Sequence, residues 1–243
     1  MFANTSVINS FLKAISPLPD RLGSLERDDT IIGLDEMLYH LREIDSSADI
    51  KFGVTKMVII ADSLKNVVIK IPFNGTYNIV ENNDDDYDEY SSILDNYEWY
   101  DFSYAPSKVD DSDYCLVEFE MYRALKKQKL HSFVAKTVFY MMWEGYRIFL
   151  QEKVIPFCDY FDTSKLTPIT QKEIDSASSI PFRRGRSEWL AHCIQTYGEK
   201  KTKRFFSYCE NENPDIVGDF HTGNYGYRPN GTPCILDYSN YCE

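Results

Sequence analysis

A stretch near the C-terminal end of the chain, residues 218–238, constrains the fold more than any other segment. It reads GDFHTGNYGYRPNGTPCILDY, and its Asn230-Gly231 pair before a short apolar run is a strong signal for the turn of a β-hairpin. The sequence therefore predicts a loop, a strand, a tight turn and a second strand. Asp237 follows the apolar run, at the far end of the second strand.

Three oxygen-bearing side chains fall on this scaffold. Asp219 and Asn224 lie on the predicted loop with Gly223 between them, and a glycine can adopt the positive φ that would aim both side chains at one point. Asp237 would reach the same region from the second strand. Carboxylate and amide oxygens, together with substrate phosphates, are usual ligands of Mg²⁺. The segment therefore predicts a magnesium-binding loop.

The order of these residues resembles that of the protein-kinase-like superfamily, in which D-x-x-x-x-N precedes a metal-binding Asp at a strand end. The wording GDFHTGN is similar to that of aminoglycoside and choline phosphotransferases and of small kinase-like proteins from phages and bacteria. The resemblance implies that Asp219 is the catalytic base, which accepts the proton of an acceptor hydroxyl. It also implies that Asn224 and Asp237 hold Mg²⁺, while His221 shapes the loop.

An upstream lysine fits the same resemblance. Residues 50–73 contain two β-branched runs, VTKMVIIAD and KNVVIKIPF, which predict a hairpin leading into a strand that carries Lys70. A lysine between buried apolar residues needs an anionic partner or a ligand phosphate, unless it lies on an edge strand and reaches solvent. V-V-I-K resembles the superfamily pattern whose lysine holds the α- and β-phosphates of the nucleotide.

A helix predicted over residues 114–129 supplies the expected partner of this lysine. In the superfamily, a glutamate of this helix pairs with the strand lysine. Glu118 and Glu120 both lie near the helix start, and helical periodicity alone does not choose between them. We favour Glu118, while the ordinary alternative for both is an acidic first turn that is favourable beside the helix dipole.

Two further segments are expected to contact the nucleotide. Gly53 is the one glycine in the segment where the superfamily has a glycine-rich loop over the phosphates. Farther along, two predicted strands, FVAKTVFYMMW and YRIFLQEKVIP, are joined by a Glu-Gly turn. The end of the second run resembles the connection between the two lobes, which implies that the backbone of Glu152, Lys153 and Val154 contacts the adenine edge.

Charged segments outside this set have two interpretations each. Residues 74–113 are acidic and rich in Tyr and Asn, which is typical of a solvated insertion, with docking of a basic partner as the alternative. Arg183, Arg184 and Arg186 precede a predicted helix start, where they would pair with the protein's own carboxylates or grip a phosphorylated acceptor.

The fold class implied by the resemblance is α+β, a two-lobed protein-kinase-like fold. Its parts are a helical N-terminal extension (1–49, with an amphipathic helix over 34–44), an N-lobe with an antiparallel sheet and one helix (50–152), and a truncated, mainly helical C-lobe (153–243). Within the C-lobe, residues 157–186 are predicted to be loop-rich and to precede helices over about 187–197 and 198–209. Only residues 238–243 follow Asp237, so we expect no activation segment and no peptide-binding platform within this chain.

Composition narrows the expected partners and compartment. A formal net charge of −12 over 243 residues argues against binding to nucleic acid and to an anionic membrane surface. The sequence has no run of ~18 apolar residues that would span a membrane and no basic, cleavable start. Six widely spaced cysteines without C-x-x-C predict reduced thiols instead of a zinc site, and hence the cytoplasm, or a host's cytoplasm for a phage-encoded protein.

The leading expectation is a phosphotransferase that uses ATP and Mg²⁺ and acts on a hydroxyl acceptor, either a small molecule or a protein partner. The acceptor would be bound by the N-terminal extension, by the acidic insertion or by a second copy in a homo-oligomer. One alternative is a pseudokinase that binds a nucleotide or a partner without catalysis, and another is a nucleotidyl transferase. The residues Lys70, Asp219, Asn224 and Asp237 favour the enzyme, whereas the sparse glycine loop favours the binding module.

Overall fold

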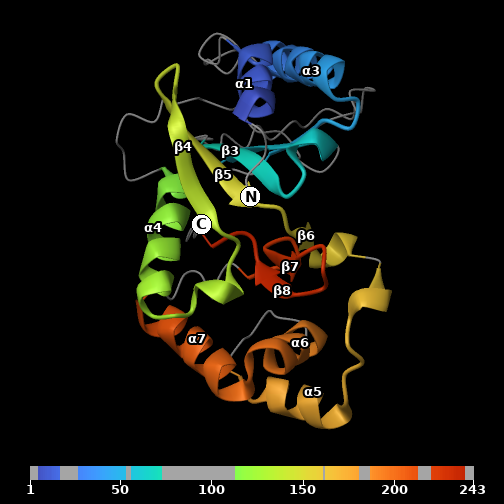
Figure 1. The fold of residues 1–243 in the computed structure, drawn as a ribbon, viewed down its shortest axis with the longest axis vertical. Coiled ribbons are helices and arrows are strands. Elements are labelled where there is room, and N and C mark those ends of the chain that lie inside the picture. The colour runs from blue at the N-terminus through green and yellow to red at the C-terminus, as the bar shows by residue number, and fades with distance from the viewer. Residues whose placement is uncertain are drawn as a thin grey trace, which may run out of the picture. The chain divides into compact units, whose positions relative to one another are not determined.

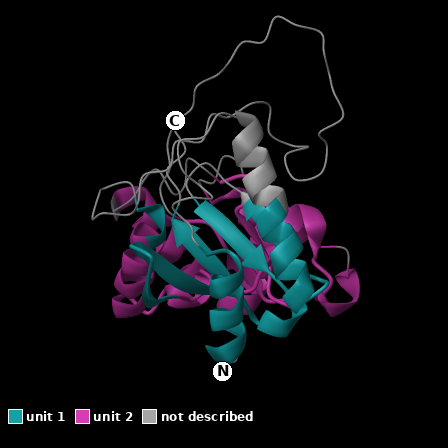
Figure 2. Ribbon diagram, turned by 90° about the horizontal axis from the view of Figure 1, so that it is seen from above, with its two compact units in different colours: residues 1–115, 138–151 teal, residues 116–137, 152–243 magenta. Residues whose placement is uncertain are grey.

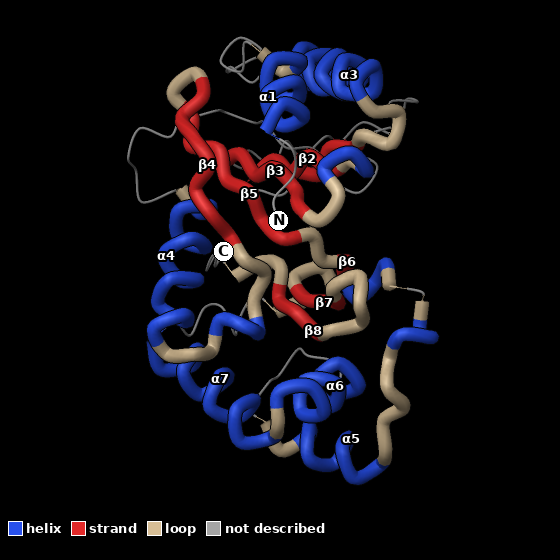
Figure 3. Tube along the Cα trace, viewed as in Figure 1, coloured by secondary structure: helices blue, strands red, loops and turns tan. Residues whose placement is uncertain are grey.

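The structure is a computed structural model, which describes residues 5–16, 27–52, 56–72, 113–160, 162–180, 187–212 and 220–238. The fold is α+β, as predicted, and Figure 3 separates its helices from its strands. The chain forms two compact units, unit 1 with residues 1–115 and 138–151 and unit 2 with residues 116–137 and 152–243 (Figure 2). The chain enters unit 2 for the last time after Gln151, close to the predicted start of the C-lobe at residue 153.

Unit 1 is built on a five-stranded sheet in the order β1-β2-β3-β5-β4. Its elements are α1 (Thr5–Ala14), α3 (Arg27–Ile44), β1 (Asp49–Phe52), β2 (Lys56–Ile60), β3 (Val67–Pro72), β4 (Thr137–Trp143) and β5 (Tyr146–Glu152), as labelled in Figure 1. β2 and β3 form the predicted hairpin, with Val58 opposite Lys70. Glu144 and Gly145 join β4 to β5 with φ angles of 50° and 89°, both positive as in the tightest hairpin turns. The strands predicted for this unit are therefore confirmed.

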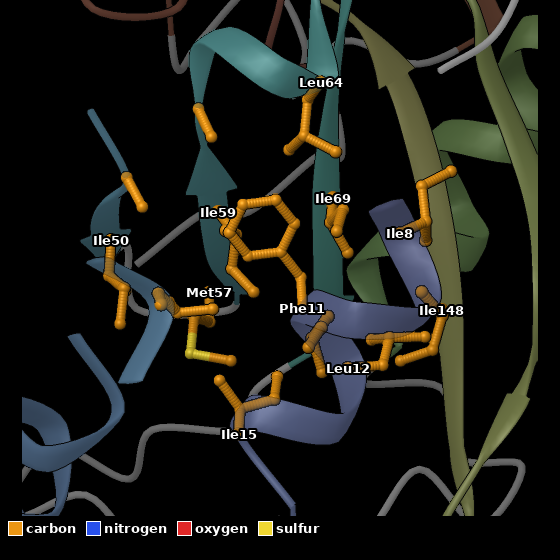
Figure 4. Packing of buried hydrophobic residues seen from close by; sticks show 14 of the residues in the cluster. Ile8, Phe11, Leu12, Ile15, Ile50, Met57, Ile59, Leu64, Ile69 and Ile148 are labelled. Carbon is orange, nitrogen blue, oxygen red and sulfur yellow. The ribbon is translucent and has the colours of Figure 1, made fainter. Parts of the chain in front are cut away.

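Two helices share a core with one face of this sheet. Alternate strand residues, including Ile59 of β2, Ile69 of β3 and Ile148 of β5, lie on this face and are fully buried. Phe11 of α1 packs among them (Figure 4), and α3 adds further apolar side chains. The helix predicted over residues 34–44 is longer at its N-terminal end, and it buries Met37, Leu38 and Leu41 but exposes Ile44. The segment expected as an N-terminal extension thus contributes directly to the core.

Unit 2 is mainly helical and carries a small antiparallel sheet in the order β6-β7-β8. Its elements are α4 (Tyr114–Lys127, whose first two residues are grouped with unit 1), β6 (Ile155–Pro156), α5 (Gln171–Ser178), α6 (Ser187–Tyr197), α7 (Glu199–Glu212), β7 (Tyr225–Tyr227) and β8 (Pro233–Ile235). α4, α6 and α7 confirm the predicted helices. A single residue, Gly198 with a φ of 84°, connects α6 to α7.

α5 is a helix within the segment over residues 157–186 that was predicted to be loop-rich. A capping box closes its start, because the Thr170 hydroxyl accepts from the N–H of Glu173 and the Glu173 carboxylate accepts from the N–H of Thr170. This reciprocal bonding satisfies two backbone donors that would otherwise have no partner at a helix start. The prediction was wrong for residues 171–178, although the pattern T-x-x-E was present in the sequence.

β7 and β8 form the predicted hairpin, but with a longer turn than the two-residue kind. The N–H of Gly231 donates to the carbonyl of Arg228 at 2.9 Å, and Gly231 itself has a φ of 83°. This is the pattern of a type I turn followed by a glycine in the left-handed conformation. β6 pairs with the other side of β7 and completes a three-stranded sheet that the sequence did not predict.

Gly226 lies at the centre of this small sheet, opposite Pro156 on β6 and Cys234 on β8. Its carbonyl accepts a hydrogen bond from the buried indole N–H of Trp189 at 2.8 Å, which ties α6 to the sheet. A Cβ atom at this position would lie 1.9 Å from the carbonyl oxygen of Ile155. Only glycine therefore lets β6 approach β7 this closely.

His192 makes a second connection between α6 and β7. Its Nε2 lies 3.1 Å from the carbonyl oxygen of Thr167, and its Nδ1 lies 2.8 Å from the Tyr227 hydroxyl. Because a carbonyl can only accept, Nε2 carries the proton and Nδ1 accepts from the hydroxyl, which is the pattern of a neutral imidazole. Burial lowers the pKa of His192 below its ordinary value, in agreement with this pattern.

Substitution of Gly226 by alanine tests the close approach of β6 and β7. We expect Gly226→Ala to lower the free energy of unfolding by at least about 3 kcal/mol, because the added methyl group must separate the two strands. Gly198→Ala is the matched control, since a Cβ there meets nothing within 4 Å and only the positive φ is strained. Its expected cost is about 1–2 kcal/mol. Equal losses for both variants, measured by urea unfolding, would contradict the steric argument.

Stability should fall as the pH decreases from about 7.5 to 5.5, because His192 is held neutral in the folded chain while the unfolded chain takes up a proton near pH 6.5. Burial, together with Lys126 and Lys201, also lowers the pKa of His131, so both histidines act in the same direction. Each contributes a slope of at most about 1.4 kcal/mol per pH unit. His192→Gln should flatten the dependence of urea unfolding on pH relative to the matched substitution His40→Gln. Identical pH profiles for the wild type and His192→Gln would rule out this role.

Candidate functional site

The hairpin of unit 2 brings together Asn224 and Asp237, the two predicted metal ligands. The carbonyl of Asn224 accepts hydrogen bonds from the N–H groups of Leu236, at 2.9 Å, and of Asp237, at 3.2 Å. Asn224 is buried, and Asp237 is half-buried. Both residues therefore stand at the same end of the β7-β8 pair, one directly before β7 and the other just after β8.

The loop that leads into β7 is shaped by His221, as the resemblance implied. The ring Nδ1 accepts from the N–H of Gly223 at 3.1 Å, and the carbonyl of His221 accepts from the N–H of Asn224 at 2.9 Å. The expected positive φ at Gly223 is wrong, because the glycines with positive φ among the described residues lie elsewhere. Glycine is favoured here for another reason: a Cβ at this position would lie 2.8 Å from Cε1 of His221, so the exposed ring would have to shift.

Tyr238 anchors the backbone immediately after Asp237. Its hydroxyl donates to the carbonyl of Ala135 at 2.6 Å and shares a second hydrogen bond with the hydroxyl of Thr137 at 2.8 Å. Burial, followed by the charge of Glu118, raises the pKa of Tyr238 well above its ordinary value. The hydroxyl therefore stays protonated and holds the end of the hairpin against the start of β4.

α4 buries one of its two candidate glutamates and exposes the other. Glu118 is fully buried, whereas Glu120 is exposed. The charge of Glu118 also contributes to the raised pKa of Tyr238. Burial thus separates the two residues that helical periodicity left open, and it favours Glu118.

Lys70 lies on β3 in unit 1, on the opposite sheet face from the core shared with α1 and α3. Its neighbours Ile69 and Ile71 belong to that core, so the alternation along the strand directs Lys70 to the other face. Lys70 is nevertheless only 3% exposed, and β3 lies between β2 and β5. The alternative of an edge-strand lysine that reaches solvent is therefore wrong. A buried ammonium group requires an anion or hydrogen-bond acceptors around it.

Glu152 is part of a network that the sequence reasoning did not foresee. Its carboxylate accepts two hydrogen bonds from Arg228, from Nε at 2.9 Å and from Nη2 at 3.2 Å. The same guanidinium donates to the carbonyls of Ser132 and Val134, both at 3.2 Å. Arg228 stands in the hairpin turn, and its place beside Asn230-Gly231 gave no signal of a buried partner. Arg228 thereby joins the hairpin turn to the last residue of β5 and to the residues before β4.

The three residues predicted to contact an adenine edge, Glu152, Lys153 and Val154, differ in their backbone hydrogen bonds. The N–H of Glu152 donates to the carbonyl of Lys136 at 2.9 Å, so this donor is already used. By contrast, neither Lys153 nor Val154 forms a backbone hydrogen bond to another described residue. Contacts to an adenine edge are therefore expected from Lys153 and Val154, not from the N–H of Glu152.

Several predicted features lie outside the described residues. They are Asp219, Gly53, the arginines Arg183, Arg184 and Arg186, and the acidic insertion up to residue 112. Asp113, at the end of that insertion, is described: its carboxylate is buried and accepts a hydrogen bond from Nη1 of Arg147 at 2.8 Å. Asp113 is therefore tied to β5 by an ion pair within unit 1.

Removal of the Glu152 charge should destabilise the fold, because it leaves the Arg228 guanidinium without its carboxylate in a largely buried position. We expect Glu152→Gln to lower the free energy of unfolding by about 3 kcal/mol. Glu199→Gln is the matched control, since Glu199 forms an exposed pair with Lys203 at 2.7 Å and its loss should have no measurable effect. Urea unfolding at neutral pH measures both. A loss no larger for Glu152→Gln than for the control would contradict the structural role of this pair.

Comparisons of the chain with protein-family models, with curated proteins and with solved structures find no match. Among the described residues, no helix has the length and apolar character needed to cross a membrane. The same part of the chain contains no cluster of three His, Cys, Asp or Glu side chains suited to a metal ion, and the predicted ligand pair includes an asparagine. The functional argument therefore rests on the geometry of the residues described above.

Proposed function

We propose that the chain is a phosphotransferase with a kinase-like arrangement of two lobes, which transfers a phosphoryl group from ATP to a hydroxyl acceptor with the help of Mg²⁺. The observation that carries this proposal is the closure of the β7-β8 pair by Asn224. One carbonyl oxygen receives the N–H groups of both Leu236 and Asp237, which keeps two oxygen-bearing side chains at one end of the hairpin. In this proposal Asn224 and Asp237 are the metal ligands, and Asp219 is the base.

The donor chemistry of this pair fits the proposed metal. Asp237 offers a half-buried carboxylate and Asn224 an amide oxygen on a buried side chain. Magnesium is usually held by one or two such groups and completes its coordination with water and substrate phosphates. When bound, Mg²⁺ would neutralise negative charge on the phosphates. Two protein oxygens are therefore a sufficient contribution from this part of the chain.

Lys70 supports the proposal through its burial. Taking an ammonium group out of water is costly, and a strand interior with Ile69 and Ile71 on either side is an unfavourable place for it unless an anion compensates. In this proposal Lys70 holds the nucleotide phosphates, and Glu118, the buried glutamate of α4, is the residue that orients the lysine. The backbone of Lys153 and Val154, which forms no hydrogen bond to another described residue, is the proposed contact for the adenine edge.

The proposal is tested with ATP labelled separately at the γ- and α-phosphates, incubated with Mg²⁺ and a panel of hydroxyl acceptors that includes water and the chain itself. We expect transfer of the γ-label only, because the proposed base acts on a hydroxyl that attacks the terminal phosphate. Asp237→Asn, Lys70→Met and Asp219→Ala should each lower the rate by about 10²-fold or more. Asp175→Asn, an exposed position on α5, is the control and should keep the wild-type rate.

Three outcomes would contradict the proposal in different ways. Binding of MgATP measured by calorimetry, without turnover of either label, would indicate a binding module of the pseudokinase kind. Transfer of the α-label would indicate nucleotidyl transfer. If the chain neither binds MgATP nor turns over either label, the nucleotide has no role in its function.

A further inference from the structure

A basic patch covers the junction of α4 and α7 in unit 2. Its exposed members are Lys126, Lys127, Lys129, Lys200, Lys203 and Arg204. Two contacts hold the contributing segments together: Nη2 of Arg204 donates to the carbonyl of Gln128 at 3.3 Å, and Nζ of Lys201 donates to the hydroxyl of Ser132 at 3.0 Å. Figure 1 shows the C-terminal end of α4 beside α7. The two runs of basic residues therefore form one surface.

The segments that form this surface contain few carboxylates. The sequence has no Asp or Glu from residue 121 to residue 143, and none from residue 200 to residue 209. Within the described part of the chain, the six exposed cations form one ion pair, between Lys203 and Glu199 at 2.7 Å. Because the whole chain has a net charge of −12, such a concentration of unpaired positive charge is not a by-product of composition.

The arrangement also costs the fold some stability. α7 begins with Glu199 and then places Lys200, Lys201 and Lys203 in and next to its first turn, where the helix dipole disfavours cations. The positive charge of the patch also acts on the half-buried His131, because Lys126 and Lys201 add to burial in lowering its pKa. Folding thus gives no reason for this concentration of charge, whereas binding of an anionic ligand does.

The composition of the patch indicates the kind of ligand. The large apolar side chains that are exposed among the described residues are Tyr39 and Ile44 on α3 and Phe139 and Met142 on β4, all outside the patch. Protein interfaces depend on buried aromatic or apolar anchors, which the patch does not offer. Nucleic-acid backbones are contacted by Lys and Arg through charge alone. The patch therefore fits a polyphosphate backbone better than a protein surface.

We propose that this patch binds the phosphate backbone of a double-stranded nucleic acid without reading its sequence. The expectation from net charge pointed the other way, but at ~0.1 M salt charges act over only ~10 Å, so the local surface decides. The acidic remainder of the chain limits the affinity and keeps the interaction reversible. The proposal does not depend on phosphoryl transfer, and either function can fail without the other.

The test is the fluorescence anisotropy of labelled DNA and RNA duplexes of about 20 base pairs, titrated with the full chain between about 25 and 200 mM salt. We expect binding whose affinity falls linearly with salt on logarithmic axes. Lys126→Gln/Lys127→Gln/Lys200→Gln/Lys203→Gln should weaken binding at the lowest salt by at least about tenfold and reduce the slope by about 3 to 4. Circular dichroism verifies that this variant is folded, which is expected because the substitutions relieve repulsion.

The control variant is Lys51→Gln/Lys165→Gln, which removes two exposed lysines that are each paired with an aspartate, at 2.9 Å and 3.2 Å. It should bind the duplexes as the wild type does. The proposal is overturned if the wild type does not bind at the lowest salt, or if the patch variant and the control bind equally. It is also overturned if polyglutamate of the same total charge displaces the duplex as well as unlabelled duplex does, since the patch would then fit an acidic protein partner.

Discussion

The packing of the hairpin in unit 2 depends on the hydrogen bonds that the guanidinium of Arg228 donates. It lies in the hairpin turn and reaches three other places in the sequence, namely Glu152 and the carbonyls of Ser132 and Val134. A planar group with five fixed donors can satisfy several acceptors at once, which a lysine could not do with the same geometry. Without it, the half-buried carboxylate of Glu152 would lose its cationic partner, and the carbonyls of Ser132 and Val134 would each lose a hydrogen bond. This side chain fixes the turn of the hairpin that carries Asn224 and Asp237, while Tyr238 holds its other end.

Local patterns were enough to predict much of the fold. Asn230-Gly231 and the Glu-Gly pair after β4 each marked a hairpin because their residues tolerate backbone conformations that others do not. For Lys70 the apolar strand indicated burial, but the alternative of an edge strand stayed open until β3 was seen to lie between β2 and β5. Burial of Glu118 was beyond such reasoning, because two glutamates two residues apart differ only in which tertiary neighbours they meet.

Other features of the site depend on contacts between distant segments and left no local trace. Arg228 reads as an ordinary turn residue until the approach of Glu152, 76 positions away, is known. The pairing of β6 with β7 is equally non-local, and Gly226 is explained only by the backbone of Ile155. Gly223 shows the converse, in that the residue was correctly singled out but for the wrong reason: it makes room for a ring and does not reverse the chain. The capping box of α5 was the one local sequence signal that could have predicted this helix but was not used.

The single residue between α6 and α7 has a consequence for how this chain can vary. Gly198 forms helix-like hydrogen bonds to both helices: its N–H donates to the carbonyl of Ile194, and its carbonyl accepts from the N–H of Thr202. The rotation of α7 about its axis is therefore set by that of α6. Each residue of an α-helix advances by about 100°. An insertion or deletion here would therefore rotate α7 as a whole, turning Phe205 and Phe206 out of the core and its lysines into it. The length of this connection is as strictly constrained as the identity of any buried residue. At this point we expect the sequence to tolerate substitutions but no insertion or deletion.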